Sequence, residues 1–472
     1  MATIVEKANK KKIEMSKKKN IINAKKKDFK KLLGKQDAPK MVSEASHSAP
    51  SEQEIIEVSS SVKPANVFST MTVYGGKAMA GEERKEKISK IIDSWNSMKG
   101  LDDLCSVVNM VRQVLYGENA AKTSVDRLKK LAYKGRYVSF KIPKKKNGEF
   151  RSIDAPCPEL KNVQQALNFV LEEVYNPNAA AMGFVRNRSV VTNAQVHLGQ
   201  NFVYNIDLKD FFPSISSGRL YKRLMVKPFC LNKEVAGIIS DLCCYKKGNH
   251  KVLPQGAPTS PTITNIICER LDIKLTRLAK AYGLKYTRYA DDITFSGMRN
   301  LFAEDGKFCT SMRNIIENEE NFKINSNKTR LCHRRMRQEV TGLTVNSKTN
   351  VSRKYIKQLR PLIHNWEVKG YAEAQSIFVK QYAKTNTRNL KFNGEHHIEN
   401  IISGKLLYLK MVKGETDPTY KSYANRFERL CDETFGSGAK KPREQLTTSI
   451  KDGNILSALN NLATLIETNT SE

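Results

Sequence analysis

Residues 285–296 read KYTRYADDITFS, and this stretch decides the fold. Apolar or aromatic residues alternate with polar ones on both sides of Ala290-Asp291-Asp292, which is the period-two pattern of two short strands joined by a tight turn. The pattern predicts a hairpin with Asp291 and Asp292 at its tip. An Asp-Asp dipeptide in a turn is most often a solvated loop, so its interpretation depends on the other segments of the chain.

A third carboxylate follows an apolar run in NFVYNIDLKDFFPSI, residues 201–215. Asp207 ends the predicted strand. A strand-borne Asp beside a hairpin Asp pair is a suitable ligand set for two Mg²⁺ ions, which activate a hydroxyl and neutralise a leaving pyrophosphate. Carboxylates crowded this closely repel one another without a cation. We therefore predict Asp207, Asp291 and Asp292 as catalytic and metal-binding residues.

The composition limits the class of protein. The chain has 472 residues, 40% of them hydrophobic, and Lys plus Arg outnumber Asp plus Glu by 80 to 48, a net charge of +32. A folded protein with a polyanionic partner is expected. The apolar runs are too short to span a bilayer, the first residues lack a signal-peptide pattern, and the nine cysteines show no C-x-x-C spacing. These features predict a reduced, cytoplasmic protein with no membrane partner, no disulfide framework and no structural zinc.

Changes in composition divide the chain into four parts. Residues 1–66 begin with fourteen lysines in the first forty positions and continue as a Ser- and Glu-rich linker, so we expect a disordered basic arm. Residues 67–135 show helical apolar spacing. Residues 136–360 mix strands and helices without strict alternation, which favours an α+β fold. Residues 361–472 are predicted to be mostly helical. Within residues 353–413, basic and aromatic side chains are interspersed, a combination that suits RNA binding.

Three further segments accompany the carboxylates. FKIPKKKNGEFRSI at 140–153 predicts a basic β-ribbon through its Asn-Gly turn, LPQGAPTSP at 253–261 forms a Gln-Gly turn before an apolar helix, and INSNKT occupies 324–329. In this order, with YADD, they resemble the polymerase motifs of reverse transcriptases. The resemblance runs from about Tyr137 to Leu362. It implies a right-hand polymerase with fingers, palm and a mostly helical thumb, preceded by the basic N-terminal extension.

Two more segments resemble the retron subgroup of these enzymes. They are the N-A-x-x-H pattern at 193–197 and the V-T-G tripeptide at 340–342. A single histidine is more often structural than functional, but the resemblance implies a role in RNA positioning. The RNA-binding residues so predicted are Asn193, His197, Val340, Thr341 and Gly342.

The resemblance also implies a set of side chains around the incoming dNTP. Phe212 would place a ring under the sugar and exclude a ribose 2′-OH, and Gln255 would support nucleotide and template. Arg151 and Lys144 (or its neighbours Lys145 and Lys146) of the fingers would contact the triphosphate. Lys328 would protonate the leaving pyrophosphate.

For a retron reverse transcriptase, the resemblance implies copying of part of a cognate structured noncoding RNA into multicopy single-stranded DNA. It also implies priming from an internal guanosine 2′-OH, two Mg²⁺ ions, dNTPs, an RNA–DNA product and a role in antiphage defence with a separate effector protein. Two alternatives stay open. One is another bacterial reverse transcriptase, of the group II intron or diversity-generating kind. The other is a catalytically idle RNA-binding scaffold, against which the three carboxylates argue.

Overall fold

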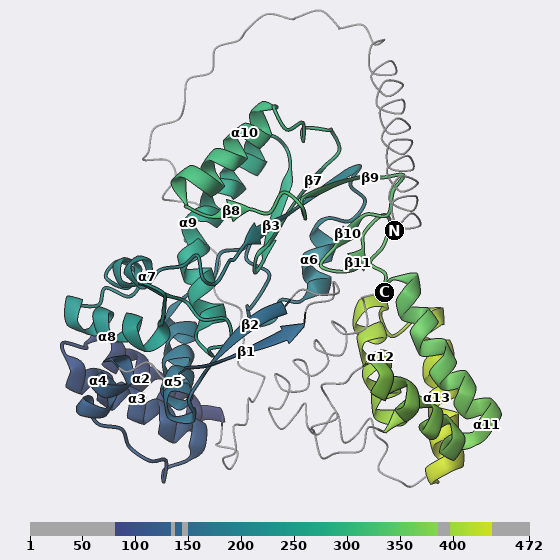
Figure 1. Ribbon diagram of the computed structural model, residues 1–472, viewed down its shortest axis with the longest axis horizontal. Coiled ribbons are helices and arrows are strands. Elements are labelled where there is room, and N and C mark those ends of the chain that lie inside the picture. The colour runs from purple at the N-terminus through teal and green to yellow at the C-terminus, as the bar shows by residue number, and fades with distance from the viewer. Residues whose placement is uncertain (1–80, 134–136, 144–149, 386–396, 437–472) are drawn as a thin grey trace, which may run out of the picture. The chain divides into compact units, whose positions relative to one another are not determined.

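The computed structural model describes residues 81–133, 137–143, 150–385 and 397–436 (Figure 1). The predicted basic arm at 1–66 lies outside them. The described helices are α2 (Gly81–Asn96), α3 (Leu101–Tyr116), α4 (Val125–Tyr133), α5 (Pro158–Val174), α6 (Val190–Val196), α7 (Ser217–Leu224), α8 (Lys233–Cys243), α9 (Ser260–Ala281), α10 (Lys307–Arg313), the π-helix η2 (Asn314–Glu319), α11 (Arg353–Thr385), α12 (Ile398–Lys413) and α13 (Pro418–Phe435). The described strands are β1 (Tyr137–Pro143), β2 (Phe150–Pro156), β3 (Phe202–Lys209), β4 (Tyr245–Lys247), β5 (His250–Val252), β6 (Lys285–Tyr289), β7 (Asp292–Gly297), β8 (Lys323–Ile324), β9 (Arg330–His333), β10 (Glu339–Val340) and β11 (Leu343–Thr344).

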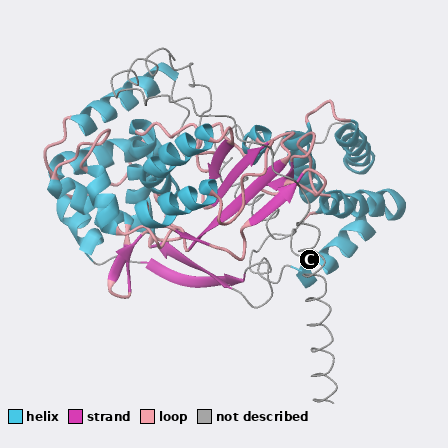
Figure 2. Ribbon diagram, turned by 90° about the horizontal axis from the view of Figure 1, so that it is seen from above, coloured by secondary structure: helices cyan, strands magenta, loops and turns pink. Residues whose placement is uncertain are grey.

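The central sheet has the strand order β6-β7-β3-β8, and β9 also pairs with β3 (Figures 1 and 2). All these pairings are antiparallel. Three separate two-stranded sheets are formed by β1–β2, β4–β5 and β10–β11. The predicted hairpin over 285–296, the strand ending near Asp207 and the α+β mixture are therefore confirmed.

The two faces of β3 bury side chains in different cores. Tyr204, Ile206 and Leu208 belong to a core shared with α9 and α10. Val203, which points to the opposite face because strand side chains alternate, belongs to a second core with α6, β10–β11 and the C-terminal helices. The strand is thus covered on both sides near its start, where Phe202, Val203 and Tyr204 are consecutive apolar residues, whereas Asn205 and Asp207 follow Val203 on the second face.

The N-terminal helices α2 to α4 join the first of these cores. In α3, Leu104, Val108 and Val111 follow helical spacing and are at most 1% exposed. The same core contains Leu160 and Leu167 of α5. The helical spacing read from the sequence before residue 135 thus corresponds to helices packed on the following segment.

The C-terminal helices α11, α12 and α13 form the larger part of the second core, in which Trp366 is 2% exposed. Helix α11 is broken at Gly370, whose φ of 74° is left-handed and lies outside helical geometry. The described helices include none that is both long enough and apolar enough to cross a membrane.

Candidate active site

Strand pairing brings the three predicted carboxylates together. In the β3–β7 register, Asp207 lies opposite Asp292, and the backbone N–H of Leu208 donates to the carbonyl of Asp291 at 3.0 Å. The turn between β6 and β7 requires a left-handed φ of 55° at Ala290. The hairpin tip therefore presents Asp291 and Asp292 beside the end of β3.

Two of the three carboxylates have raised pKa values, because they are buried and lie close to other negative charges. Burial, and then the charge of Asp207, raise the pKa of Asp291. Burial of its carboxylate, and then the charges of Asp291 and Asp207, raise the pKa of Asp292 to about 7. The residue as a whole is nevertheless exposed. Lys328 opposes both shifts. A cation placed here would be favoured because it would relieve this repulsion.

Asp207 already has two donors. Lys328 Nζ lies 2.7 Å from Asp207 Oδ1, and Asn325 Nδ2 lies 2.9 Å from Asp207 Oδ2. Over the described ranges, no three His, Cys, Asp or Glu side chains converge as a ready metal cluster. The donor set nevertheless fits a hard divalent cation in its chemistry, since all three predicted ligands offer carboxylate oxygens. The Lys328 side chain is 59% exposed and so has room to swing away.

A buried arginine supports the catalytic turn from beneath. Arg288 and Asp272 are both 0% exposed and form a two-pronged ion pair at 2.8 and 2.7 Å. The guanidinium also donates to Asn265 Oδ1 at 3.1 Å and to the Ala290 carbonyl at 3.2 Å. Burial alone would lower the pKa of Arg288, but Asp272 more than offsets this and the pKa is raised. Sequence analysis missed this group because an arginine in a strand is ordinarily solvent-exposed, although Arg288 shares a strand face with Tyr286.

A second support comes from the segment at residues 180–184. Backbone hydrogen bonds join it to Arg288 in both directions, at 2.8 and 2.7 Å, and Asn265 Nδ2 donates to the Gly183 carbonyl at 3.0 Å. A Cβ at Gly183 would lie 2.6 Å from the backbone nitrogen of Ala290. Only glycine permits this close approach, and no sequence motif that we used marked it.

Phe212 lies next to another aromatic ring. Its centroid is 6.3 Å from that of Phe184, which is 44% exposed and has an unfavourable φ of 59°. Exposed aromatics and left-handed non-glycine residues are both enriched at functional sites. The sequence predicted Phe212 as a sugar contact. Phe184 was missed, and only its structural setting marks it.

The Gln-Gly turn is attached to the β1–β2 ribbon. The Asp154 N–H donates to the Gln255 carbonyl at 2.8 Å, and a Cβ at Gly256, whose φ is 134°, would lie 2.9 Å from Ile153. Arg151, on the same strand, is exposed and lowers the pKa of Asp291 against the effect of burial. Arg151 thus lies within electrostatic range of the carboxylates.

The predicted triphosphate contact Lys144, with its neighbours Lys145 and Lys146, lies outside the described residues.

The predicted RNA contacts divide into buried and exposed residues. Asn193, His197 and Val340 are at most 1% exposed, so any part they take in RNA binding is indirect, through the position of the segments that carry them. Their role in RNA binding stays a prediction. Thr341 and Gly342, by contrast, reach the surface. They form the left-handed turn between β10 and β11, with φ values of 47° and 80°.

His197 connects two strands of the sheet. Its Nδ1 lies 2.7 Å from Ser296 Oγ and its Nε2 2.7 Å from Thr287 Oγ1. Burial, and then Lys285, lower the pKa of His197 to about 3. The ring is therefore neutral and structural, as an isolated histidine most often is.

The two segments that resemble the retron subgroup lie against each other. Asn193 Nδ2 is 3.4 Å from Thr341 Oγ1, which in turn is 3.3 Å from the Val190 carbonyl. Val191 and Ala194 of α6 and Val340 share one core. These segments therefore shape the position of the β10–β11 turn, and their exposed residues are Gln195 and, in the turn, Gly342.

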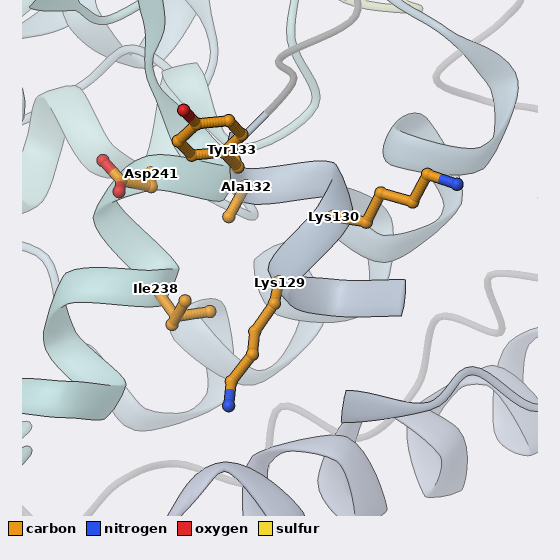
Figure 3. Close-up of a pocket in the computed structure, with 6 residues that line it drawn as sticks. All are labelled: Lys129, Lys130, Ala132, Tyr133, Ile238 and Asp241. Carbon is orange, nitrogen blue, oxygen red and sulfur yellow. The ribbon is translucent and has the colours of Figure 1, made fainter. Parts of the chain in front are cut away.

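A hollow on the surface lies apart from this site, between α4 and α8. Figure 3 shows that its two lysines point in different directions and that Tyr133 lies near Asp241. None of the predicted site residues lines it. Its lining residues are Lys129, Lys130, Ala132, Tyr133, Ile238 and Asp241.

With a β-hairpin that carries two carboxylates beside a third on the central strand, residues 142–377 match the family model "Reverse transcriptase (RNA-dependent DNA polymerase)". The chain is 38% identical over 257 residues to the Retron Mx162 reverse transcriptase of Myxococcus xanthus, covering 48% of this chain and 52% of that protein. It is 34% identical over 254 residues to the Retron Ec86 reverse transcriptase of Escherichia coli, covering 52% and 75%. The chain belongs to the retron-type bacterial reverse transcriptases.

The alignments leave part of the relatives unmatched, since the chain spans about half the length of the Mx162 enzyme and of the Retron Mx65 reverse transcriptase. Among solved structures, a telomerase from Candida albicans in complex with a fragment of telomeric RNA is similar at a TM-score of 0.35 and 11% identity. The match covers 66% of this chain and 64% of that one.

Proposed function

We propose that this protein is an RNA-directed DNA polymerase that copies part of a cognate structured noncoding RNA into single-stranded DNA. The observation that carries the proposal is the β3–β7 register, which sets Asp207 opposite Asp292 beside Asp291. The family membership supports the same chemistry. In this proposal β1–β2 is the fingers ribbon, the central sheet with α9 and α10 is the palm, and α11 to α13 form the thumb.

The three aspartates would hold two Mg²⁺ ions. When bound, these ions would lower the pKa of the attacking hydroxyl and neutralise the leaving pyrophosphate. The side chains of the protein position the reactants. Arg151 would contact the triphosphate as a charge-assisted donor, and Phe212 would lie under the sugar and disfavour a ribose 2′-OH.

Lys328 would act on the pyrophosphate side. Its ammonium is held 2.7 Å from Asp207 Oδ1, and hydrogen bonding to that carboxylate raises its pKa against the effect of burial. A lysine that stays protonated at neutral pH can hold a proton for the leaving oxygen.

Primer extension tests the polymerase. The full chain, with a DNA primer on an RNA template, dNTPs and Mg²⁺, should extend the primer, and Asp291→Asn should reduce the rate at least a thousandfold. Asp126→Asn, at an exposed position of α4, is the matched control and should extend normally. An Asp291→Asn protein that polymerises like wild type would refute the site, and an inactive wild type that still binds RNA would favour the scaffold alternative.

The retron-specific part of the proposal is branched priming from an internal guanosine 2′-OH and a role in antiphage defence. It is supported by the similarity to the named retron enzymes. Expression from the native locus should yield a discrete single-stranded DNA whose mobility changes after RNase and debranching treatment. Linear DNA indifferent to debranching would instead favour another kind of bacterial reverse transcriptase. Loss of phage protection with Asp291→Asn would support the defence role, which needs a separate effector protein.

A further inference from the structure

A second group of basic side chains lies at the opposite end of the central sheet from the carboxylates. On β3, Phe202 pairs with Gly297 and with His333, whereas Asp207 pairs with Asp292. Five residues of strand separate the two ends by about 16 Å. The exposed residues just beyond β7 and β9 at that end, here called the arginine surface, are Met298, Arg299, Arg334, Arg335, Met336 and Arg337.

The backbone of the arginine surface is firmly held. Asn346 Nδ2 donates to the carbonyls of Arg334 at 3.0 Å and Met336 at 2.8 Å. The Arg334 N–H donates to the Asn201 carbonyl at 2.7 Å, and Asn201 Nδ2 donates to the Met298 carbonyl at 3.1 Å. The segments after β7 and after β9 are therefore tied together. Side chains on a fixed backbone bind with a smaller ordering cost.

The charges of this surface are largely uncompensated. Arg337 pairs with Glu339 at 3.3 Å. In the part of the chain that the structure describes, no carboxylate lies within ion-pair distance of Arg299, Arg334 or Arg335. Two methionines, each 57% exposed, lie in the same surface. Surface arginines are often only solvated, but a preformed group of cations with exposed apolar side chains matches a ligand that offers both phosphates and stacking surfaces.

We infer that the arginine surface binds a folded segment of RNA that is not being copied. The inference rests on the proposed function, because it assigns a second RNA site to the same polymerase. Guanidinium groups bind phosphates as forks and stack on unpaired bases, and methionine adapts to irregular apolar surfaces. Loops and bulges of a folded RNA present unstacked bases next to phosphates, which duplexes do not.

Paired charge-removing variants test the inference. The variant is Arg334→Gln with Arg335→Gln in the full chain. The matched control is Lys129→Gln with Lys130→Gln, which removes the same charge from exposed positions of α4 (Figure 3). The probes are a fluorescent RNA hairpin with an unpaired loop and a single-stranded DNA of equal length. Binding is measured between 50 and 300 mM salt.

We expect the arginine variant to bind the RNA hairpin about tenfold more weakly near 150 mM salt, with a salt slope smaller by about 1.5, because two phosphate contacts are lost. The control should change less than twofold. Primer extension at saturating primer–template should keep the wild-type kcat, since the surface lies away from the carboxylates. Unchanged RNA affinity and slope would overturn the inference. Weakened binding of DNA alone would overturn it too, and would assign the surface to the product strand.

A failure of the polymerase proposal can be told apart from a failure of the arginine-surface inference. If the wild-type protein extends no primer, the polymerase proposal fails, whereas the comparison of hairpin affinities still decides whether the arginine surface binds RNA.

Discussion

Replacing Asp272 by Asn should weaken the central sheet far more than an ordinary loss of an ion pair. Asp272 and Arg288 have no exposed surface and share two hydrogen bonds of 2.7 and 2.8 Å. The amide keeps the size of the carboxylate but leaves the guanidinium as an uncompensated buried charge. Removing one partner of a buried pair typically costs about 3–5 kcal/mol. Tyr286, whose hydroxyl donates to Asp272 at 2.7 Å, loses its charged acceptor as well.

Native-state hydrogen exchange measures this cost locally. The amides of β6 and β7 report the free energy of opening of the strands that carry the hairpin. A loss of about 3–5 kcal/mol corresponds to exchange faster by on the order of 10²- to 10⁴-fold, up to the limit set by the stability of the sheet. We also expect slower primer extension, because Arg288 would no longer be fixed beneath the Ala290 carbonyl.

The control is Asp241→Asn, which removes an exposed carboxylate paired with Lys251 at 2.7 Å. Exposed pairs contribute about 0–1 kcal/mol, so exchange in β6 and β7 should barely change. The double variant Asp272→Leu with Arg288→Met should recover much of the stability, since paired apolar replacements of buried ion pairs are often neutral. If Asp272→Asn changes protection no more than the control does, the reasoning about the buried charge is refuted.

Three shorter predictions concern the surroundings of the same hairpin. Gly183→Ala should slow primer extension at least tenfold, because its Cβ would meet Ala290 N at 2.6 Å; Gly218→Ala, which meets nothing within 4 Å, should extend like wild type. His197 has a pKa lowered to about 3, so the unfolded state binds more protons between that value and about 6.5. The free energy of unfolding should therefore fall with decreasing pH in that window by up to about 1.4 kcal/mol per unit, and urea titrations of His197→Gln should show a flatter dependence. Mg²⁺ should raise the melting temperature of wild type more than that of Asp291→Asn, and equal shifts would argue against a cation at Asp291.

Local sequence patterns predicted the carboxylate hairpin because its determinants are local. Alternation over 285–296 indicates two strands, and the dipeptide falls at their junction, with Asp291 in the turn and Asp292 as the first residue of β7. The sequence analysis placed Asp207 beside the hairpin as part of a metal-ligand set, and the structure adds the strand register that sets Asp207 opposite Asp292. The helical segment within 67–135 was predicted from apolar spacing, and 361–472 was predicted as mostly helical.

The residues that hold the hairpin in place could not be predicted from local sequence patterns. Arginine is rarely buried, yet Arg288 is fully buried, because Asp272 on α9 and the segment at 180–184 cover that edge. The surroundings of His197 were also hidden. A motif resemblance implied a role in RNA positioning, and the structure adds that two hydroxyl groups from neighbouring strands hold the ring. Both cases depend on partners distant in sequence, which a single chain without structure does not reveal.

In the carboxylate site the backbone of the hairpin is fixed, whereas the side chain of Lys328 is free to move. Strand register, the close approach of Gly183 and the buried Arg288 all fix the backbone of the hairpin, so the burial and the crowding of charge that raise the pKa values of Asp291 and Asp292 are set by the fold. Asp207 is neutralised differently, by an exposed lysine whose side chain can leave. The rigid backbone thus holds the three carboxylates close together despite their repulsion, while Lys328 supplies a positive charge that a cation could replace. A site built this way would accept a divalent cation by rearranging side chains alone, and it would release the Lys328 ammonium toward the phosphates of the substrate.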